Sequence, residues 1–204
     1  LEKGEAFEKW LLDFVAIGTI ADLVPLINEN RVLTHYGLVV LNKTKRLGIE
    51  KLIEVAQSGV DNKGNHREID AWQIGFQLAP RLNAAGRLGH ASNAYQLLIT
   101  EDENEAIKIA EELNQTNKDR QNLTEEIFNL ADKDTNEDNK IILAVWPGLT
   151  EKSDVSTPWS GGIMGLVSGK LTEKYYRPAL AITRKESSSG EFEIIGSARS
   201  IPEF

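Results

Sequence analysis

The first half of the chain shows two hydrophobic patterns. Apolar residues recur every three or four positions over 30–41, 48–56, 69–78 and 91–98, which is the spacing of one helix face. The run LLDFVAIGTI at 11–20 is instead almost continuously apolar and rich in β-branched residues. We therefore predict four helices and, at 11–20, one buried strand of a parallel sheet.

A long helical pattern over 104–131 leads into a second half of different character. Thr100 followed by Glu103 predicts its N-cap. The polar segment 132–139 is the predicted domain boundary, and glycine-rich 161–172 is the predicted start of a helix. Strands are predicted at 141–146, 178–184 and 192–195, and loops at 58–65, 80–88, 147–158 and 186–190. The order strand, helix, strand, strand is typical of a small α/β unit.

Composition narrows the class of protein. The 204 residues are 41% hydrophobic, include no cysteine and carry a net charge of -8. Lack of cysteine excludes a disulfide scaffold and fits a reducing, cytoplasmic setting. No apolar run approaches the roughly 18 residues of a membrane span, so we expect no membrane association. Because the chain starts with Leu1 and stops after a Gly/Ser/Arg segment, we expect it to be a piece of a longer protein.

The acidic residues are concentrated in one segment, so the rest of the chain can still bind an anionic ligand. Residues 101–139 hold 13 acidic and four basic side chains, and the rest of the chain is nearly neutral. Residues 80–100 contain two arginines, one histidine and no acid. A local electropositive area of this kind can hold phosphate.

A single carboxylate follows the predicted buried strand. Asp22 would then lie beyond the carboxyl end of a parallel strand, where ligands of open α/β sheets bind. A carboxylate at this place suits Mg²⁺ or Mn²⁺. An Asp at a chain turn or helix cap is the alternative, and one carboxylate cannot form a two-metal site.

The segment APRLNAAGRL at 79–88 offers phosphate ligands. Arg81 and Arg87 can each present a bidentate guanidinium fork, and Asn83 adds an amide. Two surface salt bridges are the alternative use of these arginines.

Two further segments in the second half could bind anions. Arg177 directly precedes the predicted strand at 178–184, and a solvent-exposed charge is its alternative. In GSARS, Gly196, Ser197 and Arg199 could form a compact phosphate site from one hydroxyl and one guanidinium. A tight turn followed by an edge strand is the alternative there.

The ordered set of these motifs resembles one known family. DFVAIGTIADLVPL, APRLNAAGRL, LNQTNKDRQNLTEEI, WSGGIMGLVSGKLTEKYYRP and GSARSIPEF occur in the order found in the RecJ branch of the DHH phosphoesterases, bacterial single-strand-specific 5′→3′ DNA exonucleases. The resemblance implies an α/β fold class: the C-terminal tail of a parallel-sheet DHH domain at 1–102, a connecting helix at 103–133, and a small α/β DHH-associated domain, truncated, at 134–204.

The same resemblance implies a function and its site. Asp22 matches the last metal-ligand aspartate of a two-metal Mn²⁺ or Mg²⁺ site, and Arg81 or Arg87, Arg177, Ser197 and Arg199 match positions expected to hold the strand and its 5′ phosphate. We expect metal-dependent phosphodiester hydrolysis of single-stranded DNA in repair and recombination. The expected partners are single-stranded DNA, a helicase and a single-strand-binding protein, acting on a monomer.

This chain departs from the family pattern in two places. The upstream Asp-x-Asp, lone Asp and Asp-His-His segments do not occur in it, and Ser160 stands where the family usually carries His. We therefore expect the chain alone to be inactive. The alternatives are a module that only binds single strands or 5′ phosphates, and a DHH phosphodiesterase acting on short oligonucleotides or cyclic dinucleotides.

Overall fold

The chain forms two compact units. The structure is a computed structural model that describes residues 5–59, 67–149, 157–187 and 190–204. Unit 1 is Leu1–Asn117 and unit 2 is Lys118–Phe204. The division falls inside the long helix α8 (Glu103–Lys133), whose first half belongs to unit 1 and whose second half belongs to unit 2.

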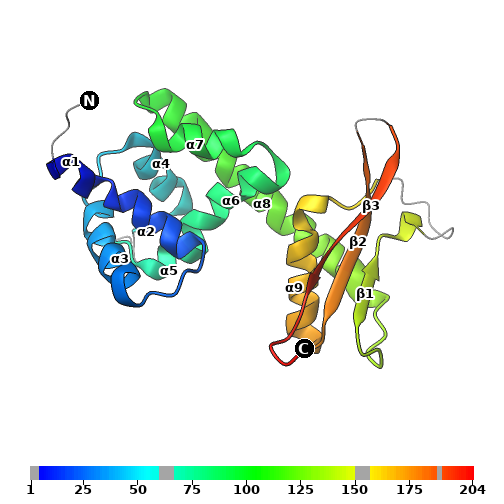
Figure 1. Cartoon of the computed structure of the whole chain (residues 1–204). Coiled ribbons are helices and arrows are strands. Elements are labelled where there is room, and N and C mark those ends of the chain that lie inside the picture. Colours follow the sequence, from blue (N-terminus) through cyan, green and yellow to red (C-terminus); the bar gives the residue numbers. More distant parts are fainter. Residues whose placement is uncertain (1–4, 60–66, 150–156, 188–189) are drawn as a thin grey trace. The chain divides into compact units, whose positions relative to one another are not determined.

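The regular secondary structure in the described part of unit 1 is all helical (Figure 1). Its elements are α1 (Glu5–Trp10), α2 (Leu12–Ala21), α3 (Asn28–Leu41), α4 (Leu47–Ala56), α5 (Ala71–Gln73), a π-helical turn (Ile74–Leu78), α6 (Ala79–Leu88), α7 (Ala91–Ile99) and the first half of α8. These helices share one core, which includes Ile20, Leu41, Leu52, Leu78, Leu97 and Leu113. The helices predicted at 30–41, 48–56 and 91–98 are confirmed, apart from shifts of one or two residues at their ends. The helix predicted at 69–78 is confirmed from residue 71, but 74–78 are π-helical and α6 follows without a break.

The strand predicted at 11–20 is wrong, because these residues form α2. The buried side chains are Asp13, Ala16, Ile17 and Ile20, at intervals of three and four residues. A short apolar run fits either a buried strand or a buried helix, so period alone cannot separate them. Asp22 therefore caps the C-terminal end of a helix, with its backbone N–H donating to Gly18 O.

The loop predicted at 80–88 is also wrong, because α6 continues directly from the π-helical turn. Pro80 lies in the first turn of α6, immediately after the π-helical turn. Ala79, Ala84 and Ala85 are buried in the helix packing. Alanine is the strongest helix former, and this outweighs the single interior glycine.

The cap of α8 differs from the prediction as well. Glu105 N–H donates to Asp102 Oδ1 at 2.8 Å, so Asp102 is the N-cap. Thr100 instead accepts from Asp102 N–H at 3.2 Å. The helix predicted over 104–131 is confirmed and extends by one or two residues at each end.

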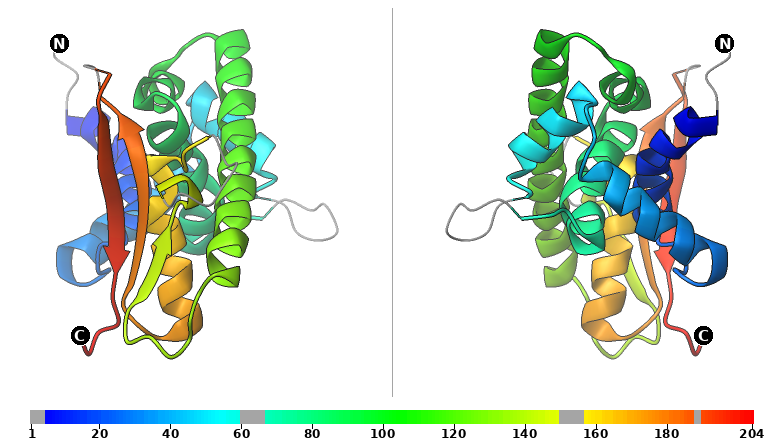
Figure 2. Two further views of the ribbon diagram at one scale, coloured as in Figure 1. Left: turned by 90° about the vertical axis from the view of Figure 1, so that its right-hand side faces the viewer. Right: turned by 90° about the vertical axis from the view of Figure 1, so that its left-hand side faces the viewer.

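Unit 2 packs one helix on a small mixed sheet. Strand β1 (Ile142–Val145) runs parallel to β2 (Ala179–Glu186), which pairs antiparallel with β3 (Phe192–Arg199). A short 3-10 turn (Pro147–Leu149) follows β1, and another (Gly161–Ile163) leads into α9 (Met164–Tyr175). Figure 2 shows α9 lying along one face of this sheet.

The two faces of the sheet differ in burial. Ala144, Ala181 and Thr183 face α9 and are buried, with side chains alternating along each strand. Leu143, Phe192 and Ile194 alternate onto the other face and are exposed. The edge strand β3 therefore offers side chains to α9 on one side only.

The predicted strands at 141–146, 178–184 and 192–195 are confirmed, but β3 is longer than expected. It runs through Arg199, so GSARS begins within the strand rather than after it. Continued pairing with β2, whose first residue Ala179 lies opposite Arg199, explains the extra length. The loops predicted at 58–65 and 147–158 fall largely outside the described residues. In the loop predicted at 186–190, Glu186 ends β2, and Ser187 and Gly190 lie in the connection to β3, where Gly190 N–H donates to Ser187 O at 3.0 Å.

The α/β class is confirmed, as a mostly helical chain with a small mixed sheet. Within the described part of unit 1 there is no strand of a parallel sheet. No helix in the described ranges is both long enough and apolar enough to cross a membrane.

Candidate nucleic-acid interface

Ser197 and Arg199 lie side by side on the face of β3 that is turned to α9. Arg199 pairs with Ala179 and Ser197 with Ala181, so their side chains alternate to the same face. Arg199 Nη1 lies 3.4 Å from Ser197 Oγ and donates to Ala198 O at 2.8 Å. Ser197 is half-buried and Arg199 is exposed. A hydroxyl and a guanidinium thus lie together on this face; below, these two residues are called the Ser197/Arg199 pair.

The backbone of this pair is fixed from α9. Thr172 Oγ1 donates to Arg199 O at 3.3 Å, and Thr172 itself is buried. This contact joins the third turn of α9 to the end of β3. No sequence signal could have found it, because it depends on how the helix lies over the strand.

Gly196 lies on the opposite face of β3 from Ser197. A Cβ at this position would come within 2.8 Å of Ala181 O on the neighbouring strand. The close approach of β2 and β3 is therefore sufficient reason for a glycine at 196.

Arg177 lies just ahead of β2, and its guanidinium is engaged at the sheet's other edge. Its Nη1 donates to Asn139 O at 2.7 Å and also to Glu137 O, both in the loop before β1. Strand β2 lies between β1 and β3, the strand that carries Arg199. The structure therefore does not bring Arg177 to the Ser197/Arg199 pair.

The two arginines of α6 differ in their surroundings. Arg81 is half-buried, and it donates from Nε to Asn114 Oδ1 at 3.0 Å and from Nη1 to Gln77 O at 2.6 Å. Burial lowers the pKa of the Arg81 guanidinium from its usual value. Asn83 and Arg87 are exposed and, being four residues apart, lie on one face of the helix. The partner Asn114, on α8, was not singled out from the sequence.

Asp22 is exposed at the end of α2 and can offer oxygen ligands. The described residues contain no group of three His, Cys, Asp or Glu side chains that could hold a metal ion. One exposed carboxylate does not make a Mn²⁺ or Mg²⁺ site, since such ions take about six ligands. These residues do not fit a metal centre by themselves.

A groove of about 380 Å³ runs between the second half of α8 and α9 in unit 2. Arg120, Thr124 and Glu125 line it from α8, and Gly165, Gly169 and Lys170 line it from α9. The side chains of Lys170 and Glu125 form an ion pair across it. The groove reaches the first turn of α9, where Gly165 lines the groove and also lies against the Ser197/Arg199 pair.

Ion pairs beyond the groove hold α8 against α9. Lys174 Nζ lies 2.6 Å from both carboxylate oxygens of Asp132, and Tyr175 donates to the same carboxylate at 2.8 Å. The hydrogen bond from Lys174 holds the pKa of Asp132 below its usual value. These contacts fix the helix from which Thr172 reaches Arg199.

Ser160 is half-buried immediately before the 3-10 turn that leads into α9. Its carbonyl accepts from Ile163 N–H at 3.2 Å. The position at which the family usually carries His is thus one short turn ahead of α9.

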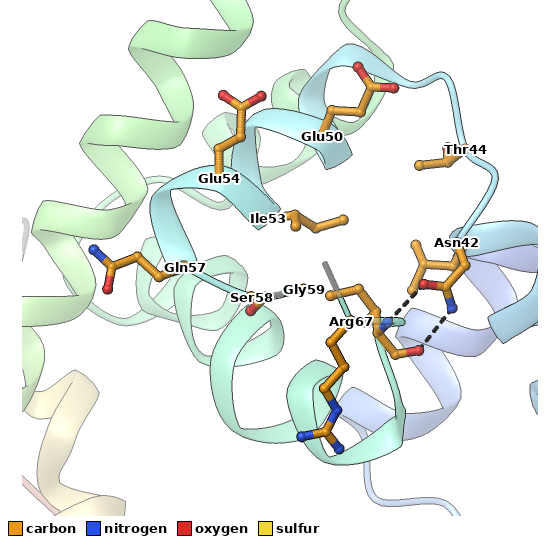
Figure 3. Close-up of a pocket in the computed structure, with 11 residues that line it drawn as sticks. Asn42, Thr44, Glu50, Ile53, Glu54, Gln57, Ser58, Gly59 and Arg67 are labelled. Carbon is orange, nitrogen blue, oxygen red and sulfur yellow. Dashed lines mark hydrogen bonds between the residues drawn. The ribbon is translucent and has the colours of Figure 1, made fainter. Parts of the chain in front are cut away.

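A larger cavity, of about 610 Å³, lies in unit 1 away from every predicted site residue (Figure 3). Its wall includes Asn42, which donates to Ile69 O at 2.9 Å and accepts from Ile69 N–H at 2.7 Å. Size alone therefore does not identify the functional surface of this chain.

Comparison with known proteins gives one consistent result. The chain is 40% identical over 198 residues to the single-stranded-DNA-specific exonuclease RecJ of Bacillus subtilis, covering 95% of this chain and 23% of that protein. It is 35% identical to the Escherichia coli protein of the same name, covering 94% of this chain and 31% of that protein. No protein-family model matches the sequence.

Solved structures agree with the sequence comparison. Thermus thermophilus RecJ in complex with Mn²⁺ matches with a TM-score of 0.74 and 31% identity, over 95% of this chain and 26% of that one. An exonuclease RecJ bound to manganese matches with a TM-score of 0.70 and 30% identity, over 88% and 43%. The chain spans about a quarter to a third of the length of the curated relatives it matches. In sequence and in fold, it therefore corresponds to one segment of the RecJ exonucleases.

Proposed function

We propose that this chain is the strand-binding part of a metal-dependent single-stranded-DNA exonuclease that degrades from the 5′ end. The relatives are named as single-stranded-DNA-specific exonucleases, and two solved ones carry Mn²⁺ or Mg²⁺. The five motifs of the family occur here in order. The proposal covers a role in DNA repair and recombination, in the cytoplasm, as a monomer, with a helicase and a single-strand-binding protein as partners.

The Ser197/Arg199 pair is the observation that carries the proposal. A guanidinium offers planar, bidentate donors to phosphate oxygens, and an adjacent hydroxyl can donate to a third oxygen. A terminal 5′ phosphate has one more free oxygen and more charge than an internal phosphodiester. The pair therefore favours the end of a strand, from which exonucleolytic cleavage starts.

Further contacts to the strand are assigned to both units. Exposed Asn83 and Arg87 on α6 would contact the DNA backbone, while Arg81 places α6 through its bonds to Asn114 and Gln77. Gly196 would support the phosphate site by letting β2 and β3 approach closely. Arg177 would hold the loop before β1 and would not contact this phosphate. Asp22 would supply one ligand to the two metal ions, with the other ligands coming from residues outside this chain.

The same proposal divides the chain by role. Residues 1–102 would form the C-terminal part of the catalytic domain, 103–133 the helix that connects the two domains, and 134–204 the associated domain. When bound, the two metal ions would activate a water and stabilise the leaving oxygen. The chain's own residues would hold the strand, orient its 5′ end and exclude duplex.

A binding module without turnover is the second candidate for the chain taken alone. It is favoured because the described residues hold no three-ligand metal cluster. Metal-dependent release of nucleotides by the 204-residue chain separates the two candidates, and we expect none.

The test of the exonuclease proposal uses a longer protein that includes the residues ahead of Leu1. It should release nucleotides from a 5′-phosphorylated single strand with Mn²⁺, and not from a blunt duplex. Loss of even an outer-shell partner costs about 10–100-fold, so Asp22→Ala should reduce the rate by about 100-fold or more. Glu29→Gln, at an exposed position on α3, is the matched control. Normal turnover in Asp22→Ala would reject the ligand role.

A further inference from the structure

Two glycines one turn apart on α9 lie against β3. A Cβ on Gly165 would come within 3.1 Å of Arg199 Nη2 and 3.2 Å of Ser197 Oγ. A Cβ on Gly169 would meet only Arg199 Cγ, at 4.0 Å. The first contact is tighter than side-chain packing allows without displacement, and the second is ordinary van der Waals contact.

Backbone conformation does not account for these glycines. Gly165 lies in the first turn of α9 and Gly169 in its interior, and neither is among the described glycines with positive φ. For Gly165, the structure supplies a steric reason instead, because a Cβ there would crowd the two side chains of the Ser197/Arg199 pair.

The geometry points to Gly165 as a positioning residue for the recognition of a terminal phosphate. We propose that its missing side chain leaves the space in which the Arg199 guanidinium lies next to the Ser197 hydroxyl. This inference rests on the proposed function, because the Ser197/Arg199 pair is its phosphate site. It adds a determinant on a different element, 34 residues before Arg199 in the sequence.

The consequence is selectivity for a phosphomonoester end. With a methyl group at 165, Arg199 Nη2 and Ser197 Oγ would have to shift by a few tenths of an ångström, which disturbs the arrangement of the pair. Each group could still meet an anion separately, so general attraction to DNA would remain. The joint contact to one terminal phosphate would be weakened.

The test compares Gly165→Ala with Gly169→Ala in the 204-residue chain. Both glycines line the α8–α9 groove, and Gly169→Ala should raise helix stability slightly. Binding is measured with two single-stranded oligonucleotides that differ only in a 5′ phosphate or a 5′ hydroxyl. Loss of one charge-assisted contact corresponds to about a tenfold change.

Gly165→Ala should lower the preference for the phosphorylated strand about tenfold without weakening binding of the hydroxyl strand. Gly169→Ala should keep the preference. The inference is overturned if Gly165→Ala retains the preference, or if both variants lose it equally, since the groove would then be responsible.

A second readout separates this inference from the proposed function. The Nε–H resonance of Arg199, observed by NMR without DNA, should shift in Gly165→Ala and stay in place in Gly169→Ala. If the wild-type chain shows no preference for a 5′ phosphate, the proposed phosphate site fails. The arginine resonance still decides whether Gly165 positions the guanidinium, and an unchanged resonance in Gly165→Ala rejects that role.

Discussion

The two units use the same residue type in different ways. In unit 1, Arg81 is half-buried and donates to Asn114 and to Gln77 O, which ties α6 to α8. In unit 2, Arg199 is exposed on an edge strand, and its guanidinium is bonded only within its own strand by the contacts given above. The sequence motifs offered both as phosphate ligands. The difference teaches that an arginine remains available to a ligand when helix packing does not need it.

A second arginine of unit 1 is also engaged in packing, because it pairs with a buried aspartate. Asp13, on α2, is 1% exposed and lies 2.8 Å from Arg46 Nε. It also accepts from Phe14 N–H at 2.8 Å, while the Arg46 guanidinium lies 4.1 Å from the Phe14 ring centroid. In unit 1, an aspartate and an arginine thus join α2 to the start of α4.

The largest effect should come from breaking this buried pair. Asp13→Ala should lower the free energy of unfolding by about 3 kcal/mol, the low end for buried pairs because Arg46 is partly exposed. Chemical denaturation measures this loss. Lys108→Ala removes an exposed helix ion pair and should change stability little. A loss below about 1 kcal/mol in Asp13→Ala would mean that the pair is not needed in unit 1.

A smaller effect should distinguish the two arginines of α6. Arg81→Met removes the bonds to Asn114 and Gln77 and should cost about 1–2 kcal/mol of stability, with little change in affinity for single strands. Arg87→Met should instead weaken binding and reduce its dependence on salt. Denaturation and titrations at several salt concentrations measure both. If Arg81→Met weakened DNA binding more than Arg87→Met did, the contrast between an arginine used in packing and an exposed arginine would fail.

Sequence pattern predicted the elements whose period is unambiguous. The helices α3, α4, α7 and α8 have one apolar face, and the three strands are short apolar runs between loop signals. Residues 11–20 could not be assigned in this way, because α2 is apolar on most sides. The segment that forms α6 resembles a polar loop when only PRLN and GR are considered. Its alanines, which pack against neighbouring helices, are the residues that favour the helix.

The candidate site was predictable only in part. Ser197 and Arg199 are two residues apart, so any strand through them places both on one face. Their position over α9, and the space that Gly165 leaves for them, depend on register and helix packing. The difference between Arg81 and Arg87 depends on Asn114, which is 33 residues from Arg81 along the chain. Local sequence contains no record of such a partner.

The most direct test of the central claim is the affinity of this chain for single strands that carry a 5′ phosphate or a 5′ hydroxyl. Wild type should prefer the phosphate about tenfold. Arg199→Ala should abolish that preference and Ser197→Ala should reduce it, while both variants keep the melting temperature of wild type. Equal affinity of wild type for the two strands, or an undiminished preference in Arg199→Ala, would contradict the assignment of the Ser197/Arg199 pair as the 5′-phosphate site.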